Sequence, residues 1–516
     1  RMQSPNRMWA IGLTVVVVGL LSALLYVNSR SGAKPAGGSG AGKPSEGPLI
    51  FYCAAGIKPP VNAVVAAFTA ETGIPIRLQY AGSGTLLSNL QIARLGDLYL
   101  AGDSSFIDMA REKELVEEAL PLATLRPVIA VPADNPKGIE TVEDLLGADL
   151  RLGLGNPGAA SIGKQTRKAL EVAGLWEKVE AAARARGVFK PTVNEVANDI
   201  KIGTVDVGII WDATARQYPE LKIVCPLSAD PAFVMHVTVG VLSCSKRATD
   251  ALRLARYLSA PSKGGRVFQK SGYEPIRGDP WAETPEILLL SGGVNRSAIE
   301  DTLRAFEARE GCRVTRVYNG CGILVAQIKA GERPDAYFAC DVSFMDEVQD
   351  LFLDSTDLSE TDIIIAVGKG NPKGIGGLAD LAAEGCKLGV ANPKQSALGA
   401  LTSRLLKDAG LLEGVMANNK SQTPTADLLV NQLRTGTLDA VIVYEANVAR
   451  VLEHLDIVRI SHPDAKAVQP FAVSQETTYP LLTHRLLRAL CSKRSRRRYM
   501  GSGFRLLTTP PNGQSE

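Results

Sequence analysis

The sequence repeats itself, and this repeat limits what the chain can fold into more than any other feature. The pentapeptide NPKGI occurs at residues 135–139 and again at 371–375. Longer stretches correspond in the same order, such as GTVDVGIIWDA in the first half and GTLDAVIVYEA in the second. The spacing between matching stretches drifts slowly, as expected after a duplication followed by small insertions and deletions. A chain of 516 residues is too long for one ordinary domain. We therefore predict two copies of one domain, copy one at 48–280 and copy two at 285–508.

Each copy alternates short apolar runs with amphipathic stretches. In copy one, LIFYCAA is typical of a buried strand, and PPVNAVVAAFTAETG is typical of a helix that ends at Gly73. Strands that alternate with helices predict an α/β fold, in which helices cover both faces of a mostly parallel sheet. Ligands of such sheets bind at the carboxyl ends of strands, where loops lead into helices. We therefore expect functional residues directly after strands.

The loops at these places are rich in Gly, Ala and Ser and nearly free of charge. Small residues let backbone N–H groups approach a ligand, and a helix N-terminus directs its donors and its positive dipole end toward that ligand. Any one of these loops could be a tight turn without a ligand. Four of them recur in both copies, which favours a site for a small oxyanion. In copy one they lie at 53–60, 81–85, 156–163 and 191–211.

Two nucleotide-like patterns overlap in copy one. GLGNPG resembles the dinucleotide fingerprint, and GAASIGKQ resembles a phosphate loop, but Gln165 stands where that loop needs a hydroxyl. Neither pattern recurs in copy two, so we predict no nucleotide cofactor.

Other catalytic and metal-binding signatures are also missing from the sequence. Asp212 and Glu445 correspond between the copies and could be a catalytic carboxylate, but we interpret each as the cap of the following helix. The eight cysteines include no CxxC, and four scattered histidines suggest no metal site. A net charge of +3 argues against a nucleic-acid partner. We predict a protein that is not an enzyme, has no cofactor and holds most cysteines as small buried side chains.

The N-terminal region differs from the rest of the chain. Residues 8–27 are uncharged and long enough to span a bilayer as a helix, and two arginines before them favour a cytoplasmic N-terminus. We predict a cytoplasmic stub and transmembrane anchor at 1–29, with a cleaved signal peptide as the alternative. Residues 30–47 are rich in Gly, Ser and Pro and predict a flexible linker. We expect a disordered tail at 509–516.

The order of the loop motifs resembles that of the molybdate-binding substrate-binding proteins of ABC importers, in the type 2 periplasmic binding protein superfamily. The stretches that carry the resemblance include YAGSGTLLSNLQI, NPGAASIGKQTRKALEVAGLW and GTVDVGIIWDAT. The resemblance covers nearly all of copy one and, more weakly, copy two. It implies tandem type 2 periplasmic-binding-protein domains after one transmembrane helix. Each domain would have two lobes with mostly parallel sheets, joined by crossing strands, with an anion clamped in the cleft.

The resemblance also implies which residues hold the anion. In copy one these positions are Ala55, Gly56, Ser83, Ser161, Ile162, Val193 and Trp211. In copy two they are Gly293, Val294, Cys321, Ala397, Ala426 and Tyr444. Family members often carry a serine at the position of Gly56 and a tyrosine at that of Trp211. Copy two keeps Tyr444, but the thiol of Cys321 is a weak donor. Any metal would be present only within a bound oxyanion.

The function implied is extracytoplasmic capture of an oxyanion, with molybdate or tungstate first, for delivery to the permease of an ABC importer. The domains would lie on the periplasmic side of a membrane that residues 8–27 cross. A membrane-anchored anion sensor is the alternative, and so is binding of another anion such as sulfate or a small carboxylate. The sequence does not choose among these anions, nor does it show whether copy two binds one.

Overall fold

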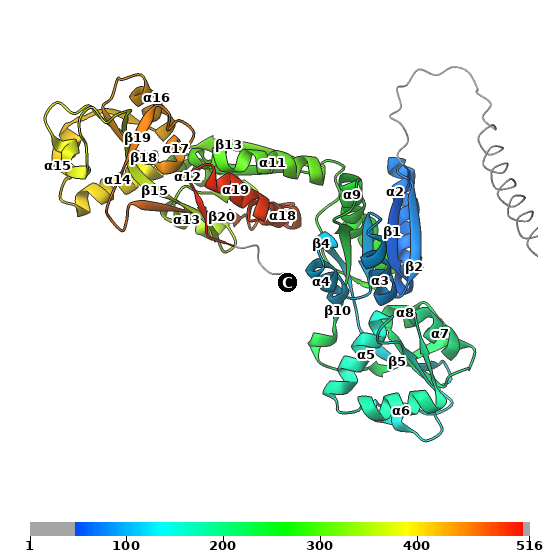
Figure 1. Ribbon diagram of the computed structural model, residues 1–516. Helices are drawn as coiled ribbons and strands as arrows, with labels where there is room; N and C mark the ends of the chain where they lie inside the picture. The colour runs from blue at the N-terminus through cyan, green and yellow to red at the C-terminus, as the bar shows by residue number, and fades with distance from the viewer. Residues whose placement is uncertain (1–46, 509–516) are drawn as a thin grey trace, which may run out of the picture. The chain divides into compact units, whose positions relative to one another are not determined.

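The computed structural model of the protein describes residues 47–508 (Figure 1). The predicted anchor at 8–27, nearly all of the linker and the tail at 509–516 lie outside the described residues. Within the described part of the chain, no helix has both the length and the apolar character needed to cross a membrane.

The first lobe of copy one is a six-stranded sheet with helices packed on it. Strand β1 is buried along almost its whole length and runs parallel to its neighbours β2 and β3, whereas β10 runs antiparallel to β3 and β4. The strand order is β11-β4-β10-β3-β1-β2. The strands are β1 (Leu49–Ala54), β2 (Ile76–Ala81), β3 (Leu98–Ala101), β4 (Val116–Leu125), β10 (Met235–Leu242) and β11 (Glu274–Pro275). The helices are η1 (Ala55–Ile57), α2 (Lys58–Thr72), α3 (Ser83–Ala93), α4 (Ser104–Glu112), α9 (Ala248–Ser259), η4 (Pro261–Gly265) and α10 (Arg266–Lys270). As predicted, α2 ends at Gly73, whose φ of +71° is left-handed.

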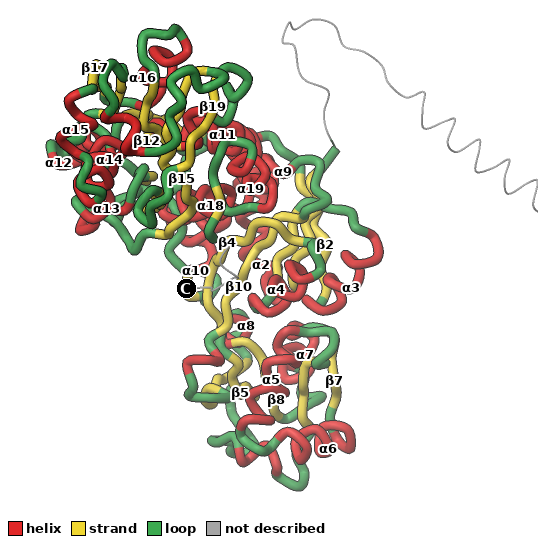
Figure 2. The backbone as a smooth tube through the Cα atoms, turned by 60° about the vertical axis from the view of Figure 1, so that its left-hand side comes forward, coloured by secondary structure: helices red, strands yellow, loops and turns green. Residues whose placement is uncertain are grey.

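The second lobe of copy one is a five-stranded sheet in the order β7-β6-β8-β5-β9, surrounded by helices (Figure 2). The chain crosses between the lobes twice, at Arg126 between β4 and β5, and again between β9 and β10. The strands are β5 (Pro127–Pro132), β6 (Leu152–Gly155), β7 (Val188–Lys190), β8 (Val207–Trp211) and β9 (Leu221–Pro226). The helices are η2 (Glu143–Leu146), α5 (Ser161–Val172), α6 (Trp176–Arg186), α7 (Val193–Lys201), α8 (Asp212–Arg216) and η3 (Pro231–Phe233).

Copy two repeats this order of elements. Its one large difference is β15 (Thr356–Gly368), which takes the place of both β4 and β5 and so joins both lobes in one ten-stranded sheet. The other strands are β12 (Glu286–Gly292), β13 (Arg313–Asn319), β14 (Ala336–Phe338), β16 (Leu388–Ala391), β17 (Asn419–Thr423), β18 (Ala440–Tyr444), β19 (Leu455–Arg459), β20 (Lys466–Val473) and β21 (Arg505–Leu506). The helices are η5 (Gly293–Asn295), α11 (Arg296–Glu310), α12 (Cys321–Lys329), α13 (Val342–Asp346), η6 (Gln349–Leu351), η7 (Leu378–Ala382), α14 (Ala397–Asp408), α15 (Leu412–Ala417), α16 (Ala426–Arg434), α17 (Glu445–Val448), α18 (Pro480–Leu490) and α19 (Lys493–Met500).

The prediction of mostly parallel sheets is wrong, because all the sheets are mixed. In copy one β5 runs antiparallel to both β8 and β9, and in copy two β20 runs antiparallel to β14 and β15. The physical reason is the double crossing between lobes. The strand that leaves a lobe and the strand that returns to it run in opposite directions. When these two strands pair, as β4 and β10 do, the sheet contains antiparallel neighbours.

The repeated NPKGI pentapeptide forms the same tight turn in each copy. Asn135 has a φ of +42°, and its side chain accepts from Ile139 N at 3.1 Å and donates to Ile139 O at 3.0 Å. Asn371 has a φ of +47° and makes the same two bonds to Ile375, at 3.0 and 2.8 Å. Asn tolerates the left-handed region and bonds its own backbone, so this residue suits the turn. The pentapeptide marks equivalent places in the two copies and lies away from the ligand loops.

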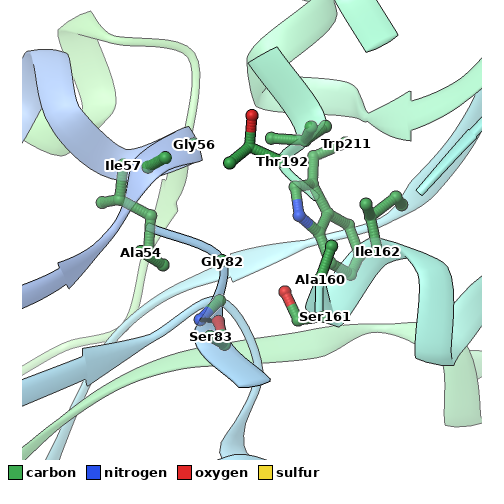
Figure 3. A pocket seen from close by; sticks show the side chains of 13 residues that line it. Ala54, Gly56, Ile57, Gly82, Ser83, Ala160, Ser161, Ile162, Thr192 and Trp211 are labelled. Atoms are coloured by element: carbon green, nitrogen blue, oxygen red, sulfur yellow. Dashed lines mark hydrogen bonds between the residues drawn. The ribbon is translucent and has the colours of Figure 1, made fainter. Parts of the chain in front are cut away.

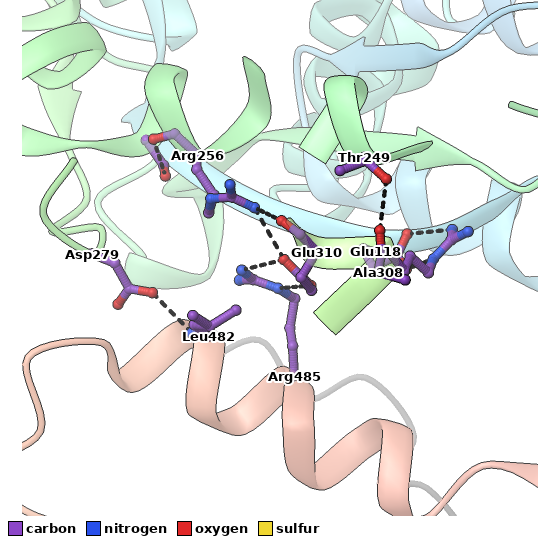
Figure 4. Close-up of polar contacts among 10 residues, drawn as sticks. Glu118, Thr249, Arg256, Asp279, Ala308, Glu310, Leu482 and Arg485 are labelled. Carbon is purple, nitrogen blue, oxygen red and sulfur yellow. Dashed lines mark hydrogen bonds and ion pairs between the residues drawn. The ribbon is translucent and has the colours of Figure 1, made fainter. Parts of the chain in front are cut away.

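Each copy has its own hydrophobic cores. The clusters of copy one lie between Leu49 and Tyr273, and those of copy two lie between Ile287 and Leu506. Both copies belong to one compact unit, and polar contacts join them. Buried Glu310 of copy two bonds Arg256 of copy one and Arg485 of α18 (Figure 4).

Candidate functional site

A small pocket lies between the two lobes of copy one (Figure 3). Its cavity volume is about 20 Å³, and a cavity needs roughly 10–15 Å³ to hold one water. All seven residues predicted for copy one line the pocket: Ala55, Gly56, Ser83, Ser161, Ile162, Val193 and Trp211. Six others that the sequence analysis did not name line it as well: Ala54, Ile57, Gly82, Gly102, Ala160 and Thr192. The loops chosen from the sequence thus meet in one pocket, and the role of these residues in binding an anion stays a prediction.

Helix N-termini converge on this pocket from both lobes. Helix α3 begins there at Ser83, α5 at Ser161 and α7 at Val193. The N-cap residues of α3 and α5 are Gly82 and Ala160, and neither provides a side-chain cap. Helix N-termini leave backbone N–H groups without partners inside the helix, and they carry partial positive charge. No residue lining the pocket has a charged side chain, so the pocket offers neutral donors and positive dipole ends.

The Ser83 hydroxyl is held in place by its neighbours. Its Oγ accepts from Gly102 N at 3.0 Å, and the Tyr99 hydroxyl donates to Ser83 O at 2.8 Å. A hydroxyl has one donor and two acceptor positions, so the Ser83 hydrogen stays available for a ligand. A Cβ on Gly102 would lie less than 3.0 Å from Ser161 Oγ. Gly102 therefore leaves room for a second hydroxyl, and Figure 3 shows Ser161 on the opposite lobe with its hydroxyl on the side of Ser83.

The first loop explains why glycine stands at position 56. The Tyr273 hydroxyl donates to Gly56 O at 2.8 Å, and burial raises the pKa of Tyr273, which keeps it a neutral donor. A Cβ on Gly56 would lie 2.6 Å from Val193 Cγ1 in the other lobe. A serine at this position would therefore collide with Val193 in the present arrangement of the lobes.

The two lobes touch each other beside the pocket. Gly84 N donates to Ala159 O at 2.9 Å, from helix α3 to the loop before α5. Lys164, the lysine of the apparent phosphate loop, instead donates to Ser105 Oγ at 2.8 Å across the cleft. Beside it, burial raises the pKa of Asp103, whose carboxylate accepts from Ser105 N at 2.8 Å at the start of α4. The lobes of copy one are thus held in a closed arrangement.

The two carboxylates that correspond between the copies, Asp212 and Glu445, do not stand at the N-cap positions of their helices. Asp212 does not line the pocket of copy one either. Asp212 is the first residue of α8, after the N-cap Trp211, and its Oδ1 accepts from Arg126 N at 3.1 Å and Ala213 N at 2.8 Å. Glu445 pairs with Arg459 at 3.0 Å. Both residues stand one position inside their helices, not at the N-cap. Asp212 still accepts from an N–H of the first turn of α8, whereas Glu445 pairs with Arg459 of β19. Within the described residues, no group of three or more His, Cys, Asp or Glu could hold a metal ion.

The six predicted residues of copy two occupy equivalent places in the fold. Cys321, Ala397 and Ala426 begin α12, α14 and α16, and Tyr444 ends β18. Gly293 and Val294 lie in η5 after β12. Cys340 N donates to Cys321 Sγ at 3.0 Å, the contact that Gly102 and Ser83 make in copy one. The Tyr444 hydroxyl is buried without a hydrogen-bond partner among the described residues, and burial raises its pKa well above the ordinary value.

Known proteins resemble parts of this chain in sequence, and the comparison with solved structures is given beside them. A protein of Haemophilus influenzae, named only as a binding protein, is 27% identical over 229 residues, 44% of this chain and 91% of that protein. The molybdate-binding protein ModA of Mycobacterium tuberculosis is 27% identical over 268 residues, 51% of this chain and 98% of ModA. A solved structure of the periplasmic molybdate-binding protein of Azotobacter vinelandii matches 44% of this chain and 98% of its own, at 16% identity and a TM-score of 0.36.

The family model for bacterial extracellular solute-binding proteins matches the chain twice, at residues 49–274 and 287–505. The two matches lie in tandem and cover most of both copies. The resemblance seen in the sequence is confirmed by these matches and by the molybdate-binding relatives. The chain belongs to the bacterial extracellular solute-binding protein family, as a tandem pair of its domains.

Proposed function

We propose that copy one binds a small tetrahedral oxyanion, molybdate or tungstate, in the pocket between its lobes. The observation that carries this proposal is an uncharged pocket where three helix N-termini and the hydroxyls of Ser83 and Ser161 meet. Hydrogen bonds to a charged group contribute about 1.5–3 kcal/mol each, so several neutral donors suffice to hold a dianion. Relatives named as molybdate-binding proteins support the choice of anion.

The same donor set argues against other ligand classes. A cation would need carboxylate or carbonyl oxygens directed at it, and no carboxylate lines the pocket. A binding protein needs no catalytic group, and we expect the chain to capture its ligand without turnover.

We further propose that the chain delivers this anion to the permease of an ABC importer. The family supports a role in solute capture. In this proposal residues 8–27 hold the chain on the membrane, with both copies on the extracytoplasmic side. An anion sensor on the same anchor is the alternative. Uptake of labelled molybdate by cells with and without the protein separates the two, because a sensor would leave the initial uptake rate unchanged.

Replacing Ser83 by alanine tests the pocket directly. Ser83→Ala removes one hydroxyl donor, which is expected to weaken molybdate binding by about 1.5–3 kcal/mol, roughly 10- to 150-fold. Calorimetric titration measures this change. Ser88→Ala is the matched control, because Ser88 lies on the same helix, is exposed and donates only to Gly84 O. Equal affinities of Ser83→Ala and the unmodified protein would remove Ser83 from the site.

The two copies are expected to bind unequally. Copy two has Cys321 and Ala397 in place of Ser83 and Ser161, so two hydroxyl donors are lost. We predict that copy two binds the same anion at least about tenfold more weakly, for which about 1.4 kcal/mol suffices. Titration of the whole chain should therefore give one tight site per molecule. Two sites of equal affinity would show that these hydroxyls contribute little.

A further inference from the structure

Two cysteine side chains meet in copy two at the place where Ser83 and Gly102 meet in copy one. Cys321 begins helix α12, and Cys340 follows strand β14. Their Sγ atoms lie 2.6 Å apart, and the side chains are 0% and 6% exposed. Thiol sulfurs that merely pack together stay farther apart than this. The pair therefore sits close to bonding distance.

Several residues around this pair differ in size between the two copies, and the differences fit one another. In copy one, a Cβ at Gly102 would collide with the Ser161 hydroxyl. Copy two has a side chain at that position, Cys340, and Ala397 in place of Ser161 removes the hydroxyl that would obstruct it.

The strand beside the pair changes as well. Gly292 replaces Ala54 at the end of the first strand. A Cβ on Gly292 would lie less than 3.0 Å from Cys340 Sγ and 3.1 Å from Cys321 Sγ. Copy two thus has cysteines at the positions of Ser83 and Gly102, and two neighbouring residues are smaller than their equivalents in copy one. Replacing a serine by a cysteine would not by itself require smaller neighbouring residues. The combined changes therefore indicate two sulfur atoms that interact with each other.

We propose that Cys321 and Cys340 are a redox pair that closes to a disulfide in the cleft of copy two. A disulfide has a sulfur–sulfur distance of about 2.05 Å, so an approach of about half an ångström completes the bond. Both residues belong to the first lobe of copy two, in which β14 lies next to β12. The bond therefore forms without any movement of one lobe against the other.

The reaction needs an oxidant, and a small-molecule disulfide such as oxidised glutathione supplies it. The thiolate of one cysteine attacks a sulfur of this disulfide, which forms a mixed disulfide and releases one glutathione thiol. The second cysteine, having lost its proton, attacks the first protein sulfur and releases the second glutathione thiol. The two cysteines lose two electrons and two protons, and the oxidant gains them.

Burial of the two sulfur atoms slows this reaction in the folded protein. The contact with Cys321 and burial raise the pKa of Cys340 well above its ordinary value. Cys340 of the folded protein therefore forms little of the reactive thiolate. We expect slow oxidation of the folded protein and fast oxidation during folding, before the sulfurs are buried.

The bond changes what copy two can bind. A thiol is a weak hydrogen-bond donor, and a disulfide has no hydrogen to donate. Oxidation removes the side-chain donor at the position of Ser83, so the oxidised form of copy two should bind an anion more weakly than the reduced form. This inference concerns copy two and holds whatever anion copy one binds.

Thiol counting on the full chain tests the proposal. The protein is folded in the presence of oxidised glutathione, denatured and alkylated, and its thiols are counted by intact mass. We expect two of the eight cysteines to resist alkylation, and a peptide pair that links Cys321 to Cys340. Dithiothreitol should return both thiols. The control Cys386→Ala removes another buried cysteine of copy two and should still leave two thiols protected.

Variants of the pair complete the test. In Cys321→Ser every remaining thiol should be alkylated after the same treatment, or carry a single glutathione. If this variant does not fold, Cys340→Gly restores the residue that copy one has and serves the same purpose. The proposal fails if all eight thiols of the unmodified protein react. It also fails if the protected thiols map to other cysteines, or if only glutathione adducts form.

Discussion

Replacing Glu310 by alanine is expected to lower the free energy of unfolding by about 3–5 kcal/mol, because it leaves buried charges without a partner. The Glu310 side chain is only 2% exposed and accepts from Arg485 at 2.7 and 3.1 Å. Arg256 of copy one lies 3.4 Å from its Oε2. Among the described residues, two other nitrogens of Arg256 are buried without partners, so with alanine at 310 this guanidinium loses its charged partner and keeps only the backbone O of that residue.

Denaturant unfolding measures the effect, and an exposed ion pair provides the control. Glu283 pairs with Arg253, but its side chain is 72% exposed. Glu283→Ala should therefore cost less than about 1 kcal/mol. Similar small effects of the two substitutions would mean that the contact between the copies depends on other residues.

Replacing Gly82 by alanine is expected to weaken anion binding by about 3 kcal/mol, on the order of 100-fold, as overpacking at a closed interface. A Cβ on Gly82 would lie less than 3.0 Å from the carbonyl oxygens of Ala159 and Pro191, both in the other lobe. Backbone atoms cannot turn away as a flexible side chain can. The lobes must stay apart, and the donors of α3 then no longer face those of α5.

The matched control is the same substitution in copy two. Gly320→Ala would place a Cβ against Gln395 O, at the place in copy two that corresponds to Gly82 and Ala159 in copy one. This variant should leave anion binding by copy one unchanged. Gly82 has a φ of −64°, which alanine adopts without strain. The variant should therefore fold, and its unfolding midpoint shows whether it does. Unchanged affinity in a folded Gly82→Ala protein would mean that the anion is held without closure of the lobes.

The sequence predicted the local features well because they depend on local chemistry. The turn at NPKGI, the left-handed Gly73 and the glycine-rich loops each follow from residues within a few positions. The seven predicted residues of copy one meet in one pocket because, in each lobe, loops after neighbouring strands open at the same edge of the sheet, and the pocket lies between the two lobes. Duplication strengthened this inference, since it separated recurring loops from chance patterns such as GLGNPG.

Features set by contacts far apart in the chain could not be predicted in the same way. The direction of β10 depends on the second crossing between lobes, which no local pattern encodes. Gly102 was not predicted, because Asp103 follows it and the predicted loops are nearly free of charge. Cys321 follows β13 and Cys340 follows β14, so the pair becomes visible only when both strands pair with β12.

Titration of the purified chain with a panel of oxyanions tests the central claim most directly. Molybdate and tungstate should each give one saturable tight site per molecule, and sulfate and phosphate should bind more weakly. Ser83→Ala should reduce the affinity roughly 10- to 150-fold, and Ser88→Ala should leave it unchanged. The account is contradicted if no oxyanion binds, or if tight binding persists in Ser83→Ala with the affinity of the unmodified protein.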